Sequence, residues 1–76
     1  MGFLANISGK EASGVFEKFG YSVKHQSGSH LIMAHKEKPT ISIPLHKELA
    51  PGLLRGLIRK SGISVDDFLE NLGRTR

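Results

Sequence analysis

Three short segments of alternating apolar and polar residues, joined by tight turns, constrain this fold more than any other feature. They span residues 21–26, 31–35 and 40–44, and the last ends at a proline. Ser27-Gly28-Ser29 and residues 36–39 provide the turns. Period-two alternation is typical of strands that bury one face, and such turns join adjacent antiparallel strands. The pattern therefore predicts a three-stranded antiparallel meander.

Helical spacing flanks the predicted sheet on both sides. Ser8-Gly9-Lys10-Glu11 is a capping box, apolar residues then recur every three or four positions, and Gly20 provides a left-handed stop. These signals predict a first helix over about residues 9–19. A second helix is expected over about residues 51–61, and a short third helix is expected to begin after Ser64 and to end at Gly73.

The predicted order of elements is helix, three strands, helix, with both helices covering one face of the sheet. This is an α+β arrangement, a double-stranded-RNA-binding-like α-β-β-β-α fold with a short extra C-terminal helix. Residues 1–76 contain no repeat, linker or low-complexity segment, so a single domain is expected. A domain of this length buries only about 60% of the surface of its unfolded chain. Any active site must therefore lie on the surface.

The charge balance favours an anionic partner. Eleven Lys and Arg against seven Asp and Glu give a formal net charge of +4, which is compatible with nucleic-acid binding. The chain has no cysteine, so disulfides and thiolate metal ligands are excluded. The N-terminal apolar run at residues 3–5 is much too short for a signal peptide or a membrane span. We therefore expect a cytoplasmic protein with no membrane partner.

Short motifs follow one another in a fixed order over residues 8–70. They are Ser8-Gly9-Lys10-Glu11, Gly20-Tyr21, Gln26-x-Gly28-Ser29-His30, Pro44-x-His46, Glu48-Leu49-x-Pro51-Gly52-x-Leu54 and Phe68-Leu69. In order and spacing they resemble the HicA-type mRNA interferase toxins. The resemblance implies a small ribonuclease that cleaves messenger RNA through the histidine of the Gly-Ser-His motif, here His30, and that a HicB-type antitoxin protein inhibits. The chain departs from the family pattern at His25, where arginine is frequent, and in its short segment 44–51.

Ribonuclease chemistry suits these residues because RNA carries its own nucleophile, the 2′-hydroxyl. The reaction needs a base, an acid and stabilisation of the charge on the phosphate, and imidazole serves such proton transfers near neutral pH. We expect His30 to be the catalytic base. In a meander, the second strand begins at the sheet end where the first and third strands finish, and both main helices begin there too. The positive ends of both helices, the nearby lysines and two imidazoles are therefore expected to surround one rim. The expected RNA and phosphate contacts are Lys10, Lys24, Gln26, Gly28, Ser29, His46 and Lys47.

The register of the first hairpin decides which way His30 points, because a slip of one residue turns every side chain to the opposite face. A three-residue loop would turn Leu31 and Met33 toward the helices and His30 outward, on the same face as Lys24 and Gln26. A four-residue loop would turn His30 inward. We favour the three-residue loop because it buries the larger apolar set.

Two other functions remain open from the sequence. One is a non-catalytic RNA-binding module that contacts shape and phosphates, and the other is an interaction subunit that keeps the antitoxin partner without activity. A metal site is not expected, because His25, His30 and His35 are five residues apart and alternate between faces along an extended chain. No metal or organic cofactor is predicted. His25 and His35 are expected to be structural or solvent-facing.

Overall fold

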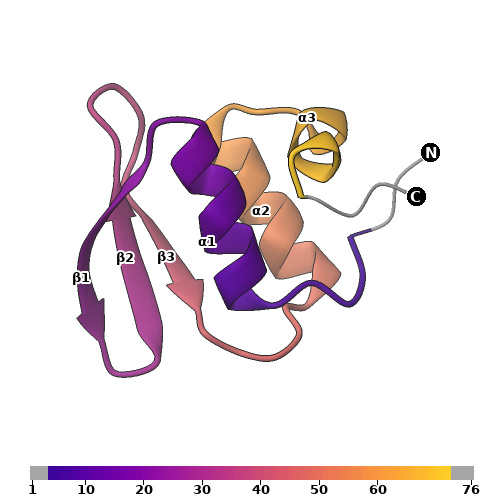
Figure 1. The fold of residues 1–76 in the computed structure, drawn as a ribbon, viewed down its shortest axis with the longest axis horizontal. Coiled ribbons are helices and arrows are strands. Elements are labelled where there is room, and N and C mark those ends of the chain that lie inside the picture. The colour runs from indigo at the N-terminus through magenta and orange to yellow at the C-terminus, as the bar shows by residue number, and fades with distance from the viewer. Residues whose placement is uncertain (1–3, 73–76) are drawn as a thin grey trace.

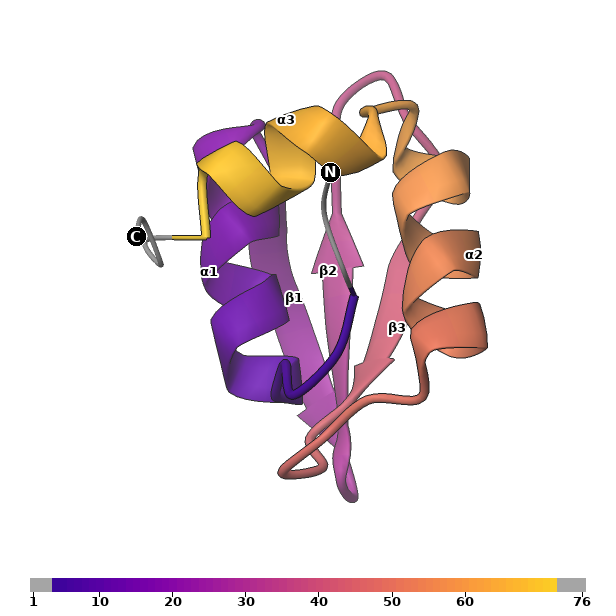
Figure 2. The same ribbon diagram turned by 90° about the vertical axis from the view of Figure 1, so that its right-hand side faces the viewer.

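The computed structural model describes residues 4–72 of the chain. The elements, in chain order, are α1 (Gly9–Lys18), β1 (Ser22–Ser27), β2 (His30–Ala34), β3 (Ile41–Pro44), α2 (Pro51–Ser61) and α3 (Val65–Glu70). The strands form one antiparallel sheet in the order β1-β2-β3. Both α1 and α2 lie over one face of this sheet (Figure 1 and Figure 2), which we call the inner face. No helix in residues 4–72 covers the opposite, outer face. The predicted α+β class and the predicted order of elements are confirmed.

The hydrophobic core lies between the helices and the inner face of the sheet. Phe16 of α1 is fully buried, and its ring centroid lies 5.5 Å from that of Phe68 in α3 and 5.8 Å from that of Tyr21. Met33 and Ile43 complete this core from the strands. Each such buried side chain stabilises the fold by about 1.5–3 kcal/mol. Since α3 has only six residues, the burial of Phe68 and not helix propensity holds it in place.

Tyr21 and His35 join the end of α1 to the sheet. The Tyr21 hydroxyl donates to the carbonyl oxygen of Pro39 at 2.8 Å, and burial raises the pKa of this phenol above its usual value. His35 Nδ1 accepts from the N–H of Glu37 at 3.0 Å, which leaves Nε2 to donate to the carbonyl oxygen of Phe19 at 3.1 Å. Both ring nitrogens are engaged, so of the two roles expected for His35, structural or solvent-facing, the structure shows the structural one.

The turn between β1 and β2 contains two residues, Gly28 and Ser29, and not the three that were predicted. Gly28 has a φ of 60°, the positive value that a type II′ hairpin turn requires at its first central position. Gln26 pairs with Leu31 across this hairpin. Paired residues project from the same face of a sheet. The prediction that Gln26 faces outward beside His30 is therefore wrong.

The faces of β2 follow the register that the sequence favoured. Met33 is fully buried, and Leu31 is half-buried and packs against the core, so both face the helices. Because successive side chains of a strand alternate between faces, His30 and Ile32 project from the outer face.

The two C-terminal helices are short and end differently. α2 is followed by Gly62 at a φ of 82°, as predicted, and Lys38 Nζ donates at 2.8 Å to a carbonyl oxygen in its last turn. α3 ends at Glu70, earlier than the predicted end at Gly73, a residue outside the part of the chain that is described. Within residues 4–72, no helix combines the length and the apolar character needed to cross a bilayer.

Gly9 brings the start of α1 into backbone contact with the segment that follows β3. Its N–H donates to the carbonyl oxygen of His46 at 3.0 Å. A Cβ atom at this position would collide with the carbonyl oxygen of Pro44 and would lie 3.0 Å from the Cα of Leu45. Backbone atoms cannot move aside as the end of a flexible side chain can. This close approach therefore requires a residue without a Cβ atom.

We expect Gly9→Ala to lower the free energy of unfolding by about 1–3 kcal/mol, the usual cost of overpacking. Urea denaturation measures this change. Gly14→Ala in the same helix is the matched control, because a Cβ there meets nothing within 4 Å. Alanine is favoured over glycine inside a helix by about 1 kcal/mol, so the control is expected to gain stability. Equal stabilities of the two variants would contradict the close approach.

Candidate functional site

All of the candidate residues except Lys24 lie at or next to one end of the molecule. The β1–β2 turn, the end of β3 and the first turns of α1 and α2 lie together there (Figure 2). The Leu45 N–H donates to the carbonyl oxygen of Ser29 at 2.7 Å, which ties the segment after β3 to the hairpin turn. The Gly9 bond to His46 ties that same segment to α1. We call this end, formed by residues 8–10, 28–30 and 45–51, the turn end.

His30 is the first residue of β2 and lies exposed at the turn end. It pairs with Ser27 on one side and with Pro44 on the other. Neither ring nitrogen of His30 has a hydrogen-bond partner among residues 4–72, whereas both nitrogens of His35 are engaged. The His30 imidazole is therefore accessible to an external ligand.

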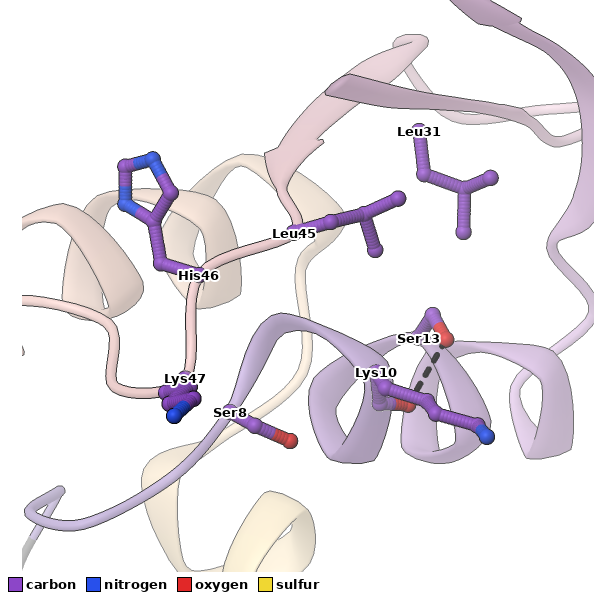
Figure 3. A pocket seen from close by; sticks show the side chains of 7 residues that line it. All are labelled: Ser8, Lys10, Ser13, Leu31, Leu45, His46 and Lys47. Atoms are coloured by element: carbon purple, nitrogen blue, oxygen red, sulfur yellow. Dashed lines mark hydrogen bonds between the residues drawn. The ribbon is translucent and has the colours of Figure 1, made fainter. Parts of the chain in front are cut away.

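An open groove of about 610 Å³ lies on the helix side of the turn end. Its lining residues are Ser8, Lys10, Ser13, Leu31, Leu45, His46 and Lys47. The side chain of Leu45 points toward Leu31, whereas the His46 ring points away from Lys10 (Figure 3). An apolar floor bordered by lysines suits a partner that carries both apolar surface and negative charge.

The structure separates His30 from this groove. Leu31 lines the groove from the inner face of β2, and the next residue back, His30, projects from the outer face. The prediction of one rim shared by all candidates is thus only half right. Lys10, His46 and Lys47 border the groove, while His30 lies at the same end on the other side of the sheet.

The remaining predicted contacts lie on or near the first hairpin and are exposed. Gly28 and Ser29 form the turn itself, and Gln26 Nε2 donates to the carbonyl oxygen of Gly28 at 3.1 Å, which braces that turn. Lys24 lies in the middle of β1, at a bulge where the pairing shifts. Lys24 is thus further from the turn end than the other candidates.

The two helix starts at the turn end differ in charge. At α1, Ser8 Oγ accepts from the N–H of Glu11, and the Glu11 carboxylate accepts from the N–H of Ser8, both at 3.0 Å. This carboxylate already offsets the positive end of the α1 dipole. At α2, the N-cap is Ala50, Pro51 follows, and the first turn has neither a side-chain cap nor an acidic residue. Of the two positive helix ends that were predicted, only that of α2 has no acidic residue in its first turn.

The apolar half of the groove was not predicted from the sequence. Leu45 follows the proline that ends β3, so the strand pattern did not predict on which face of the sheet its side chain lies or what it contacts. An apolar residue left over after a strand had ended was the available signal. Among residues 4–72 there is no group of three or more His, Cys, Asp or Glu side chains that could hold a metal ion.

A family model described as HicA toxin of bacterial toxin-antitoxin matches residues 9–63, well over half of the chain. The matched range begins at the glycine that contacts Pro44 and includes His30, all of α2 and every residue that lines the groove except Ser8. No curated protein and no solved structure matches the chain.

The uncapped start of α2 gives a stability prediction. Ala50 has φ −60° and ψ 133°, the extended conformation of an N-cap, so a serine there can accept a bond from the first turn. We expect Ala50→Ser to raise the free energy of unfolding by about 1 kcal/mol in urea denaturation. Ala5→Ser, at an exposed position outside the helices, is the matched control and should change stability by less than about 0.5 kcal/mol. Equal effects would mean that α2 gains nothing from a cap.

Proposed function

This chain belongs to the HicA toxin family of bacterial toxin–antitoxin systems, and we propose that it is a metal-independent endoribonuclease that cleaves messenger RNA through His30. The observation that carries the proposal is the family match, whose range includes this exposed histidine. Membership in the family implies a cognate antitoxin partner. We further propose that this partner is a HicB-type protein and, because messenger RNA is the substrate, that the toxin acts in the cytoplasm.

The proposed reaction begins with His30 as general base. Its free ring nitrogen takes the proton of a 2′-hydroxyl, and the oxygen attacks the adjacent phosphorus. The new bond joins O2′ to phosphorus, and the bond from phosphorus to the 5′-oxygen of the next nucleotide breaks. The departing 5′-oxygen takes up a proton, so the products are a 2′,3′-cyclic phosphate and a free 5′-hydroxyl. Exposure and the absence of competing ring partners within residues 4–72 support this role.

Binding of the RNA backbone would fall to the lysines of the groove. Lys10 and Lys47 border it from α1 and from the segment after β3, and both are exposed. The nearby first turn of α2 adds the positive end of a helix dipole, and this turn contains no acidic residue of its own. These groups lie at the same end as His30, so one RNA strand can contact the groove and the imidazole together.

We expect His30→Ala to lower the rate of RNA cleavage at least 100-fold, since loss of a general base typically costs two to four orders of magnitude. The measurement is cleavage of end-labelled RNA in EDTA, with the product ends mapped. Parental protein should yield 2′,3′-cyclic or 3′-phosphate ends.

Ser22→Ala is the matched control for this experiment, because Ser22 is exposed on β1 at the end remote from the turn. It should cleave at the parental rate. Cleavage by His30→Ala at that rate would refute the proposed role. If neither the parent nor the variant cleaves, but RNA binding persists and weakens with salt, the chain is a binding module instead.

Lys10 and Lys47, which border the groove, are the proposed contacts to the RNA backbone. We expect Lys10→Gln combined with Lys47→Gln to weaken RNA binding. The fall of the logarithm of the association constant with the logarithm of the salt concentration should become less steep by about 1–1.5, the value for two lost phosphate contacts on a single strand. The matched control is Lys36→Gln with Lys60→Gln, which removes the same charge from exposed positions in the β2–β3 connection and in the last turn of α2. Equal slopes for the two double variants would contradict a specific role for the groove.

A further inference from the structure

A bulge in β1 decides which residues share the face of His30. Val23 pairs with Met33, but the next pair is His25 with Ile32, so Lys24 is an extra residue in the strand. In an unbroken ladder Lys24 would pair with Ile32, and His25 would pair with Leu31, which lies on the inner face. The bulge therefore moves His25 to the outer face.

His25 and His30 become diagonal neighbours through this register. His25 lies opposite Ile32, and His30 lies two residues before Ile32 on the same strand and the same face. Diagonal neighbours on adjacent antiparallel strands are about 7–8 Å apart. Both histidines are exposed, and the half-buried Ile32 lies beside them. A phosphate group can therefore bind between the two imidazoles.

The surroundings offer few other proton carriers. The three strands contain no Asp or Glu, and Lys24 at the bulge is their one lysine. On the outer face, β3 places Ser42 opposite Ile32 and Pro44 opposite His30, while Ser27 of β1 also pairs with His30. No helix in residues 4–72 packs on this face (Figure 1). The imidazoles of His25 and His30 are thus the groups on it suited to proton transfer near neutral pH.

The cleavage reaction needs two proton transfers, one from the attacking 2′-hydroxyl and one to the departing 5′-oxygen. We propose that His25 is a second catalytic residue, which as an imidazolium donates its proton to the 5′-oxygen while His30 takes the proton of the 2′-hydroxyl. The O2′ to phosphorus bond forms, the phosphorus to O5′ bond breaks, and exchange with water returns both rings to their starting states. This inference rests on the proposed ribonuclease function.

The proposal predicts the pH dependence of kcat/KM. His30 must be neutral to act, so the parental rate rises with pH on the acid side. His25 must be protonated to act, so the rate falls on the alkaline side. We expect His25→Ala to lose the alkaline fall and to cleave RNA about 100-fold or more slowly. His25→Gln, which keeps a polar side chain but does not ionise, should show the same two losses. Ser22→Ala should keep the parental profile.

A substrate with a good leaving group separates proton donation from folding or binding effects. Uridine 3′-(4-nitrophenyl phosphate) releases nitrophenolate, which departs without a proton. We expect His25→Ala to cleave this compound within about threefold of the parental rate, whereas His30→Ala should remain inactive on both substrates. Thermal unfolding midpoints of the variants should match that of the parent, because both positions are exposed.

Two outcomes would overturn the inference. One is a His25→Ala protein that keeps the alkaline fall in rate, and the other is an equal loss of rate on RNA and on the nitrophenyl ester. Either result, with cleavage still dependent on His30, leaves the proposed ribonuclease function intact. Parental RNA cleavage that survives His30→Ala would instead overturn that function, and this inference with it.

Discussion

The contact between Gly9 and the backbone after β3 holds the turn end of this molecule together. It places the first turn of α1 directly against Pro44, and the N–H of Gly9 donates a hydrogen bond to the carbonyl oxygen of His46. The bond from Leu45 to Ser29 then joins the same segment to the hairpin turn. One point of close approach thus aligns a helix, two strands and a loop. A side chain at Gly9 would separate the groups that the proposed chemistry needs together.

Most of the fold was predictable because its signals are local. The capping box at Ser8 and the left-handed glycine at Gly62 mark helix limits whatever surrounds them. The bulge in β1 was not predictable, because every residue of that strand is exposed and no buried side chain fixes its register. The extra residue at this bulge, Lys24, accounts for the whole error in the predicted register of the hairpin. The loop loses one residue, and His25 takes the outer face that was assigned to Gln26.

The site was predictable to the extent that topology alone defines it. A meander with a helix before it and another after it must bring His30, Lys10 and His46 to one end, and it does. The division of that end into two faces depends on side-chain direction, which sequence pattern does not give. The electrostatics also depended on a particular contact, because the Glu11 carboxylate occupies the start of α1 and leaves α2 as the less shielded helix end.

The hairpin turn forms the boundary between these two faces. The groove with its lysines lies on the inner side, and the exposed His30 lies on the outer side. In the proposed reaction an RNA strand must cross this boundary, and the hairpin turn does not obstruct it. It has two residues, and Gly28 has no side chain and faces open space. The same glycine that gives the hairpin its tight reversal thus keeps the path between the phosphate contacts and the imidazole clear.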